Sequence, residues 1–189
     1  MRNFKIIVFL GVDGSGKSTL IDTLTKNNEK KFRKIHFVPD YFRKKNKPNI
    51  TPHKQLKRSE MFSYLIIIYW LINFYFFRLI NFNSEKIFVF DRYIYDILID
   101  PLRYRVKISK KIKKIILKFS IKPDIIFFLI GNPNKIYSRK KELKLKDTIK
   151  LNNDYLEFSK KFKNKLVLNC FHKVLFNKKK IINYLKKNF

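Results

Sequence analysis

The eight residues from Gly11 to Ser18 constrain the fold more than any other part of the chain, because they read Gly-Val-Asp-Gly-Ser-Gly-Lys-Ser. In this pattern, glycines let successive backbone N–H groups wrap around phosphate oxygens, and a lysine and a hydroxyl residue complete the site. An apolar run, residues 5–10, precedes the motif, and helical periodicity begins near Ser18. The sequence therefore predicts a strand, a phosphate-binding P-loop and a helix in direct succession.

The residue types of the loop indicate ATP and Mg²⁺ as the bound cofactors. Lys17 is expected to reach the β- and γ-phosphates, and the Ser18 hydroxyl to ligate Mg²⁺. The helix that follows presents its positive end to the same anion. The predicted nucleotide-binding residues are Gly11, Asp13, Gly14, Ser15, Gly16, Lys17, Ser18 and Thr19.

Runs rich in β-branched and aromatic residues alternate with helical patterns along all 189 residues. The predicted strands are residues 5–10, 34–38, 86–90, 124–130 and 165–168. The predicted helices are about 18–27, 52–81, 109–119, 133–143, 148–162 and 177–187. Strands that alternate with helices need crossover connections and form a parallel sheet with helices on both faces. No linker divides the chain, so we predict one three-layer α/β domain over residues 1–189.

Asp91 and Arg92 follow the apolar strand 86–90, where a parallel sheet delivers side chains to its ligand crevice. The Asp91 carboxylate can share the magnesium shell with Ser18. The Arg92 guanidinium can clamp a phosphate with two hydrogen bonds. A helix N-cap is the alternative role of Asp91, and the two roles are compatible.

Together these motifs resemble thymidylate kinase and its relatives among the nucleoside monophosphate kinases, from Phe4 to about Leu168. The resemblance implies a five-stranded parallel sheet, phosphoryl transfer from ATP, and a lid over about residues 133–147. It also implies that Asp13 faces the sugar hydroxyl of the acceptor. The implied catalytic residues are Lys17, Arg92, which would bridge the donor and acceptor phosphates, and Arg139, the first lid arginine. The motifs that carry the resemblance are the P-loop with Asp13, Asp91-Arg92-Tyr93, Pro123-Asp124, and Pro133 six residues before Arg139.

Two positions depart from the family pattern. Where relatives carry an Arg-Glu-Pro-Gly run that holds the acceptor phosphate, this chain has His36-Phe37-Val38-Pro39-Asp40. Relatives also carry a Phe that stacks on the base, followed one turn later by an Arg. In this chain the corresponding pair, Phe74 and Arg78, lies about two helical turns later than that position. We therefore predict an acceptor other than thymidylate, or thymidylate held in a non-standard way. The alternative is that Arg43, Arg58 or Arg78 replaces the missing contacts.

Charged residues beyond the magnesium site offer contacts for the acceptor. Residues 91–96, 100–105 and 139–143 resemble a thymidylate-kinase-like branch often met beside surface-polysaccharide genes. The nominal acceptor is a nucleoside monophosphate such as dTMP, and a sugar or other small polar molecule is the alternative. The candidate acceptor-binding residues are Asp13, Arg92, Asp96, Arg103 and Arg105, with a salt-bridged turn as the alternative for the last three.

The net charge of +30 ordinarily indicates nucleic acid or an anionic membrane as partner. However, lysines outnumber arginines 35 to 9, whereas readers of phosphates and bases favour the planar fork of arginine. We interpret the charge as compositional drift and expect no specific nucleic-acid partner. A basic nucleotide- or nucleic-acid-binding ATPase without kinase activity is the alternative from another functional class.

Residues 61–80 carry one charge, Arg78, and are long enough to cross a membrane. We expect this segment to be a helix buried against the sheet instead, because the strands that precede and follow it in the sequence belong to one sheet. Peripheral membrane contact and a homodimer are the alternatives that stay open. The basic amphipathic pattern of residues 109–119 favours a core-packed helix with a solvated face, and lipid contact is the alternative. The lone Cys170 and the lack of a signal-peptide cleavage site after residue 10 favour a cytoplasmic location.

Overall fold

The computed structural model describes residues 5–26, 28–36 and 56–189, which form a five-stranded sheet in the order β2-β3-β1-β4-β5. Every neighbouring pair of strands is parallel. The strands are β1 (Lys5–Gly11), β2 (Phe32–His36), β3 (Ile87–Asp91), β4 (Ile125–Ile130) and β5 (Lys165–Asn169). The predicted parallel α/β fold is confirmed.

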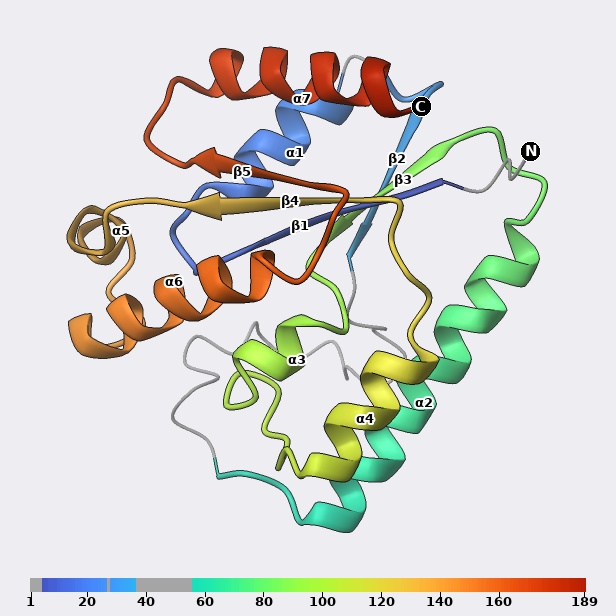
Figure 1. Cartoon of the computed structure of the whole chain (residues 1–189), viewed down its shortest axis with the longest axis vertical. Helices are drawn as coiled ribbons and strands as arrows, with labels where there is room; N and C mark the ends of the chain where they lie inside the picture. Colours follow the sequence, from blue (N-terminus) through green and yellow to red (C-terminus); the bar gives the residue numbers. More distant parts are fainter. Residues whose placement is uncertain (1–4, 27, 37–55) are drawn as a thin grey trace.

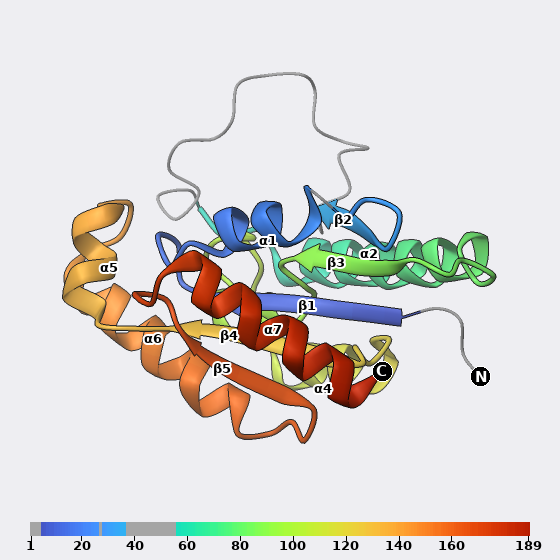
Figure 2. The ribbon, with the colours of Figure 1, turned by 90° about the horizontal axis from the view of Figure 1, so that it is seen from above.

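Helices cover both faces of the sheet, so the molecule has three layers (Figure 1). Seen from above, α1 and α7 lie together over one face (Figure 2). The other helices lie beyond the opposite face or, like α5, at the carboxyl ends of the strands. The helices are α1 (Lys17–Thr25), α2 (Glu60–Ile80), α3 (Asp96–Ile99), α4 (Lys110–Phe119), α5 (Pro133–Arg139), α6 (Leu145–Ser159) and α7 (Val174–Asn188).

The core consists mainly of the three central strands, β3, β1 and β4. Their apolar runs are buried on both sides, as continuous rather than alternating apolar sequence indicates for a covered parallel sheet. The parallel register places Val8 between Phe90 and Ile126, so the carboxyl ends of β1 and β3 meet at one edge. The P-loop and the residues after β3 are thereby brought together.

Several element boundaries differ from those that the sequence predicts. Helix α2 begins at Glu60 rather than at residue 52, because the Ser59 hydroxyl caps it by accepting a hydrogen bond from the Phe62 N–H at 3.4 Å. Strand β2 lies two residues earlier than predicted, and residues 37, 38 and 52–55 lie outside the described part of the chain. The four-residue helix α3 was not predicted, because it is too short to show a periodic pattern.

The prediction that residues 61–80 form a buried helix is wrong for most of the helix. Within α2, one stripe is buried, formed by Ser63, Ile67, Leu71 and Phe74. The remaining apolar side chains include many that are about half exposed or more. By length and a mean hydropathy of 1.6 alone, α2 could span a membrane, and it is the one such helix in the described ranges. Helix α4, in contrast, buries Ile112 and Ile116 and exposes its lysines, as the pattern predicts.

Candidate active site

The P-loop follows β1 in a backbone conformation that glycine permits. Gly14 and Gly16 have φ angles of 86° and 80°, a left-handed region that side chains with a Cβ seldom adopt. A Cβ on Gly11 would lie 2.5 Å from the carbonyl oxygen of Leu129 on β4. The predicted loop is therefore present, with its glycines where the backbone requires them.

Lys17 lies inside this loop and is almost fully buried. Its Nζ atom donates hydrogen bonds to the carbonyl oxygens of Gly11 at 2.6 Å and Val12 at 2.9 Å, and to the Ser15 hydroxyl at 3.5 Å. Burial and the nearby Arg92 charge lower the pKa of Lys17 to about 8. The carbonyl oxygens of Gly11 and Val12 thus hold the lysine ammonium. The N-cap residue of α1, Gly16, has no side chain that could occupy the helix N–H groups, which can bind phosphate.

Ser18 and Asp91 lie next to each other, as the position of Asp91 at the end of β3 predicts. The Ser18 hydroxyl donates to Asp91 Oδ2 at 2.8 Å, and Asp91 is buried. A hydroxyl and a carboxylate are hard oxygen ligands of the kind that Mg²⁺ uses when nucleotide phosphates complete its shell. No cluster of three or more His, Cys, Asp or Glu occurs among residues 5–26, 28–36 and 56–189.

Asp13 is the centre of a charged cluster beside the loop. Its two carboxylate oxygens form separate ion pairs, one with Arg92 and one with Arg103. The ammonium of Lys140 lies 3.9 Å away. Burial alone would raise the pKa of Asp13, but Arg92, Lys17, Arg103 and Lys140 together hold it well below its usual range. Asp13 is therefore a permanent carboxylate that keeps two arginines at the site.

Arg103 and Arg105 make different contacts in the structure, although the sequence analysis predicts that both bind the acceptor. Arg103 reaches Asp13, and its backbone N–H donates to Asp100 Oδ1 at 3.3 Å. Arg105 has a φ angle of 56° and its Nε donates to the carbonyl oxygen of Leu56 at 3.0 Å. The chain turns between these two positions, so Arg105 is held on the segment that precedes α2.

Asp96 is buried and does not line the site, so the structure does not support it as an acceptor contact. One carboxylate oxygen accepts a hydrogen bond from Tyr155 on α6 at 2.5 Å, and the other accepts from the Tyr93 N–H at 3.0 Å. Burial raises the pKa of Asp96, against the Arg92 charge and both hydrogen bonds. Asp96 thereby holds the turn after Arg92, whose φ angle is 82°.

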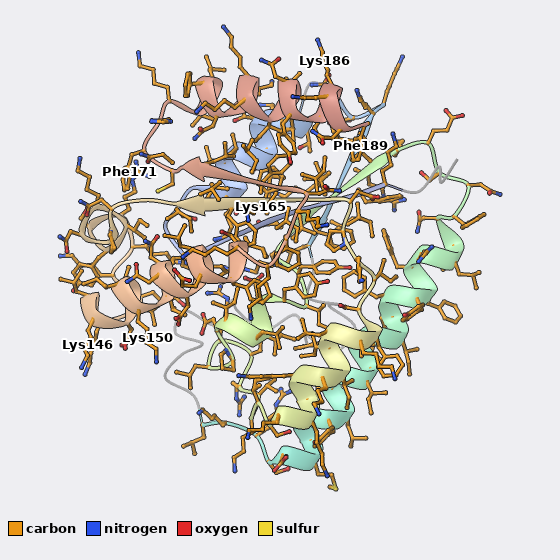
Figure 3. All side chains as sticks on the ribbon, viewed as in Figure 1. Lys146, Lys150, Lys165, Phe171, Lys186 and Phe189 are labelled. Atoms are coloured by element: carbon orange, nitrogen blue, oxygen red, sulfur yellow. The ribbon has the colours of Figure 1, made fainter. Side chains whose placement is uncertain are left out.

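A cavity of about 490 Å³ opens over the P-loop. Arg139, at the end of α5, lines it, and its guanidinium lies 4.3 Å from the centre of the Phe171 ring. Figure 3 shows Phe171 at the carboxyl end of β5, beside α5. The lining residues are Asp13, Gly14, Gly16, Lys17, Ser18, Thr19, Arg92, Arg139 and Lys140.

The structure does not support Phe74 or Arg78 at the missing family contacts. Phe74 is buried and packs against Phe90 and Tyr93, with ring centroids 5.4 and 4.8 Å away. Arg78 lies at the opposite end of the sheet, where it lines a small cavity with Asp124. The Arg58 backbone N–H donates to the carbonyl oxygen of Arg105 at 2.9 Å.

Arg43 and residues 37–40 lie outside the described part of the chain, so the structure does not place these family positions.

Sequence reasoning missed three residues of the site. Lys140 lines the cavity and lies 2.8 Å from Glu142, which is also 3.9 Å from Arg103. The basic run that begins at Arg139 was a usable signal for Lys140. No sequence signal pointed to Tyr155, because it lies 59 residues from Asp96 in the chain, on an ordinary amphipathic helix.

Comparison with known protein families gives one match, to the thymidylate kinase family, over residues 9–187. A search of curated protein sequences finds no match.

The fold is also found in solved kinases. Deoxyadenosine kinase from M. mycoides, solved with dCMP and dCDP, is 19% identical with a TM-score of 0.64, over 96% of this chain and 99% of that one. Thymidylate kinase from Candida albicans is 19% identical with a TM-score of 0.65, over 99% of this chain and 92% of that one. Neither the sugar kinase nor the nucleic-acid-binding alternative gains support from these comparisons. With the P-loop geometry and a family match over nearly its whole length, the chain belongs to the thymidylate kinase family and is a phosphotransferase.

Proposed function

We propose that this kinase transfers the γ-phosphoryl group of ATP to a nucleoside monophosphate such as dTMP. The observation that carries the proposal is the Asp13 cluster, in which Arg92 and Arg103 lie together beside the P-loop lysine. One phosphate needs one arginine fork, whereas two arginines beside a P-loop suit a donor phosphate and an acceptor phosphate. A neutral sugar acceptor would bring no anion to replace Asp13 at the second of these guanidinium groups.

The chain's own residues supply binding, orientation and charge neutralisation rather than covalent chemistry. The N–H groups of the P-loop and Lys17 would hold the β- and γ-phosphates. Ser18 and Asp91 would hold Mg²⁺, which neutralises phosphate charge when bound. Arg92 would stabilise the charge of the transferring phosphoryl group, because it lines the cavity over the P-loop and shares its ion-pair partner, Asp13, with Arg103.

Asp13 has two roles in this proposal. Without the acceptor it neutralises Arg92 and Arg103. The incoming donor and acceptor phosphates would take over the two guanidinium groups and free the Asp13 carboxylate to accept a hydrogen bond from the sugar hydroxyl. Such an exchange replaces one anion by another, so the arginines are never buried unpaired.

We further propose that residues 133–147 act as a lid within one kinase domain spanning residues 1–189. In support, Gly14 of the P-loop packs against this segment, because a Cβ there would lie 3.1 Å from the Ile136 carbonyl oxygen and 3.2 Å from Lys140 Cβ. Arg139 and Lys140 bring two positive charges over the cavity, as closure on phosphates requires. A cytoplasmic location fits a nucleotide substrate and the single, buried cysteine.

Replacing Arg103 by alanine is expected to raise the KM for the acceptor by about 10-fold to 100-fold, the effect of losing one or two charge-assisted hydrogen bonds. The KM for ATP should change less than threefold. Steady-state kinetics with each substrate varied in turn would measure both constants. Lys107→Ala is the matched control, since Lys107 lies in the same loop with its side chain exposed. An unchanged acceptor KM in Arg103→Ala would contradict the placement of the acceptor phosphate.

A further inference from the structure

Arg92 has a backbone conformation that residues with a Cβ seldom adopt. Its φ angle of 82° lies in the left-handed region, which persists at such a residue only where neighbouring contacts enforce it. The backbone conformation also sets the direction in which the guanidinium leaves the chain, toward Asp13 and the cavity over the P-loop. The contacts that fix this backbone therefore decide where the guanidinium lies.

Two sets of hydrogen bonds fix the backbone, one on each side of the Arg92 Cα. Before it, the Arg92 N–H donates to the carbonyl oxygen of Phe9 on β1 at 3.3 Å. After it, the Tyr93 N–H donates to Asp96 Oδ2 at 3.0 Å, and the Asp96 N–H donates back to the Tyr93 carbonyl oxygen at 2.9 Å. The first contact comes from the sheet, whereas the second depends on where the Asp96 carboxylate lies.

Tyr155 on α6 holds that carboxylate. Its hydroxyl donates to Asp96 Oδ1 at 2.5 Å, so the two oxygens of one carboxylate join α6 to the turn after β3. Tyr155 is buried, and Asn152, one turn earlier on α6, accepts a hydrogen bond from the Gly131 N–H at 3.3 Å, just after β4. Helix α6 is thus tied to the sheet one turn before the tyrosine, and it also packs against α3 (Figure 1).

The charges of Asp96 and Arg92 also interact. Burial raises the pKa of Asp96, and the Arg92 charge opposes that rise. Asp13 forms the direct ion pair with Arg92, so Asp96 is a second carboxylate near the same guanidinium. When substrate phosphates take the place of Asp13, Asp96 would stay where it is, because Tyr155 and the Tyr93 N–H occupy its two oxygens.

We propose that Tyr155 and Asp96 are positioning residues for phosphoryl transfer, because the hydrogen bond between them holds the turn that directs the Arg92 guanidinium into the cavity. This positioning role rests on the proposed function, in which Arg92 stabilises the transferring phosphoryl group. Tyr155 and Asp96 do not line the cavity over the P-loop, so their effect on the reaction passes through Arg92. Loss of the Tyr155 hydroxyl should therefore slow the chemical step and leave the binding of ATP unchanged.

Tyr155→Phe tests the proposal, because it removes one hydroxyl and keeps the ring in the core. With ATP and the nucleoside monophosphate that is turned over fastest, we expect kcat to fall by about 10-fold to 100-fold, since a shift of about 1 Å in a positioned group can cost this much. The KM for ATP should change by less than about twofold. Steady-state kinetics would measure both constants, and thermal unfolding would show that the variant is folded.

Tyr95→Phe is the matched control. Tyr95 is also buried, and its hydroxyl accepts a hydrogen bond from the Ser120 hydroxyl at 3.3 Å rather than contacting Asp96. Its ring packs against Phe158 on the same helix as Tyr155, with centroids 5.9 Å apart. This variant should keep kcat within about twofold of wild type, because it loses a buried hydroxyl without releasing the turn after Arg92.

A double-mutant cycle separates positioning from a general loosening of the core. In an Arg92→Ala background, Tyr155→Phe should lower kcat by less than about twofold, because the group that it positions is absent. Asp96→Asn keeps the size of the side chain and removes its charge, and it should show a similar loss with the same dependence on Arg92. It takes the place of Tyr155→Phe should that variant unfold.

The outcomes distinguish this inference from the proposed function. An equal loss from Tyr155→Phe in the wild-type and Arg92→Ala backgrounds would assign Tyr155 to stability alone and overturn the positioning role. Full kcat in Tyr155→Phe, with Arg92→Ala impaired, would overturn the positioning role and leave the proposed function standing. Full kcat in Arg92→Ala would overturn both.

Discussion

Replacing Lys17 by alanine is expected to lower kcat by about 100-fold or more, the usual effect of removing a group that stabilises transition-state charge. Lys17 is the one lysine whose ammonium lies inside the P-loop, bonded to the Gly11 and Val12 carbonyl oxygens, within the described chain. A coupled assay of ADP release at saturating substrates would measure kcat.

The control for this variant is Lys26→Ala, at the exposed end of the same helix, which should keep wild-type activity. Thermal unfolding would show whether Lys17→Ala retains its fold. A folded Lys17→Ala protein with more than about a tenth of wild-type turnover would show that the P-loop does not carry the chemistry.

Arg92→Ala should lower kcat by about 10²-fold to 10³-fold while changing the KM for ATP much less. An arginine that stabilises a transferring phosphoryl group is worth this much or more, because its contribution is greatest in the transition state. Arg92 is placed for this by the turn after β3 and by its ion pair with Asp13. Single-turnover kinetics would separate the chemical step from product release.

Arg105→Ala is the matched control for Arg92→Ala, since both arginines have positive φ angles, 56° and 82°. Any general cost of placing alanine in this backbone region is therefore common to the two variants. Arg105 bonds to Leu56 rather than to the Asp13 cluster, so its loss should leave kcat within about twofold of wild type. Equal losses in both variants would assign the effect to the backbone and not to phosphate contact.

The fold and the nucleotide side of the site could be predicted because they depend on local sequence. The P-loop lies within eight consecutive residues, and strand ends of a parallel sheet meet at one edge whatever the helices do. The contact between Ser18 and Asp91 follows from that edge.

The acceptor side could be predicted only in part, because it depends on contacts between distant segments. Arg103 and Arg105 look equivalent in the sequence, and the turn between them sends one to Asp13 and the other to Leu56. Asp96 is buried and accepts a hydrogen bond from Tyr155, a contact that no local sequence pattern predicts.

The burial of α2 was predicted wrongly for a similar reason. Hydropathy measures how apolar a helix is, but it does not indicate which of its side chains the rest of the fold covers. Here the fold buries one stripe of the helix, and many apolar side chains on its outer face are exposed. Composition could not distinguish a helix buried on all sides from one buried along a single stripe.

The most direct test of the proposed function is a screen of ADP release with the wild-type enzyme, ATP and Mg²⁺. The screen compares three sets of acceptors, which are the nucleoside monophosphates, the corresponding deoxynucleosides, and free sugars. We expect at least one nucleoside monophosphate, dTMP among the candidates, to reach a kcat/KM of about 10⁴ M⁻¹s⁻¹ or more, with formation of the nucleoside diphosphate. The deoxynucleosides and sugars should be at least tenfold poorer, because they lack the phosphate that Arg92 and Arg103 are placed to bind. Turnover of a deoxynucleoside or a sugar at that level, with every monophosphate inactive, would contradict the proposal.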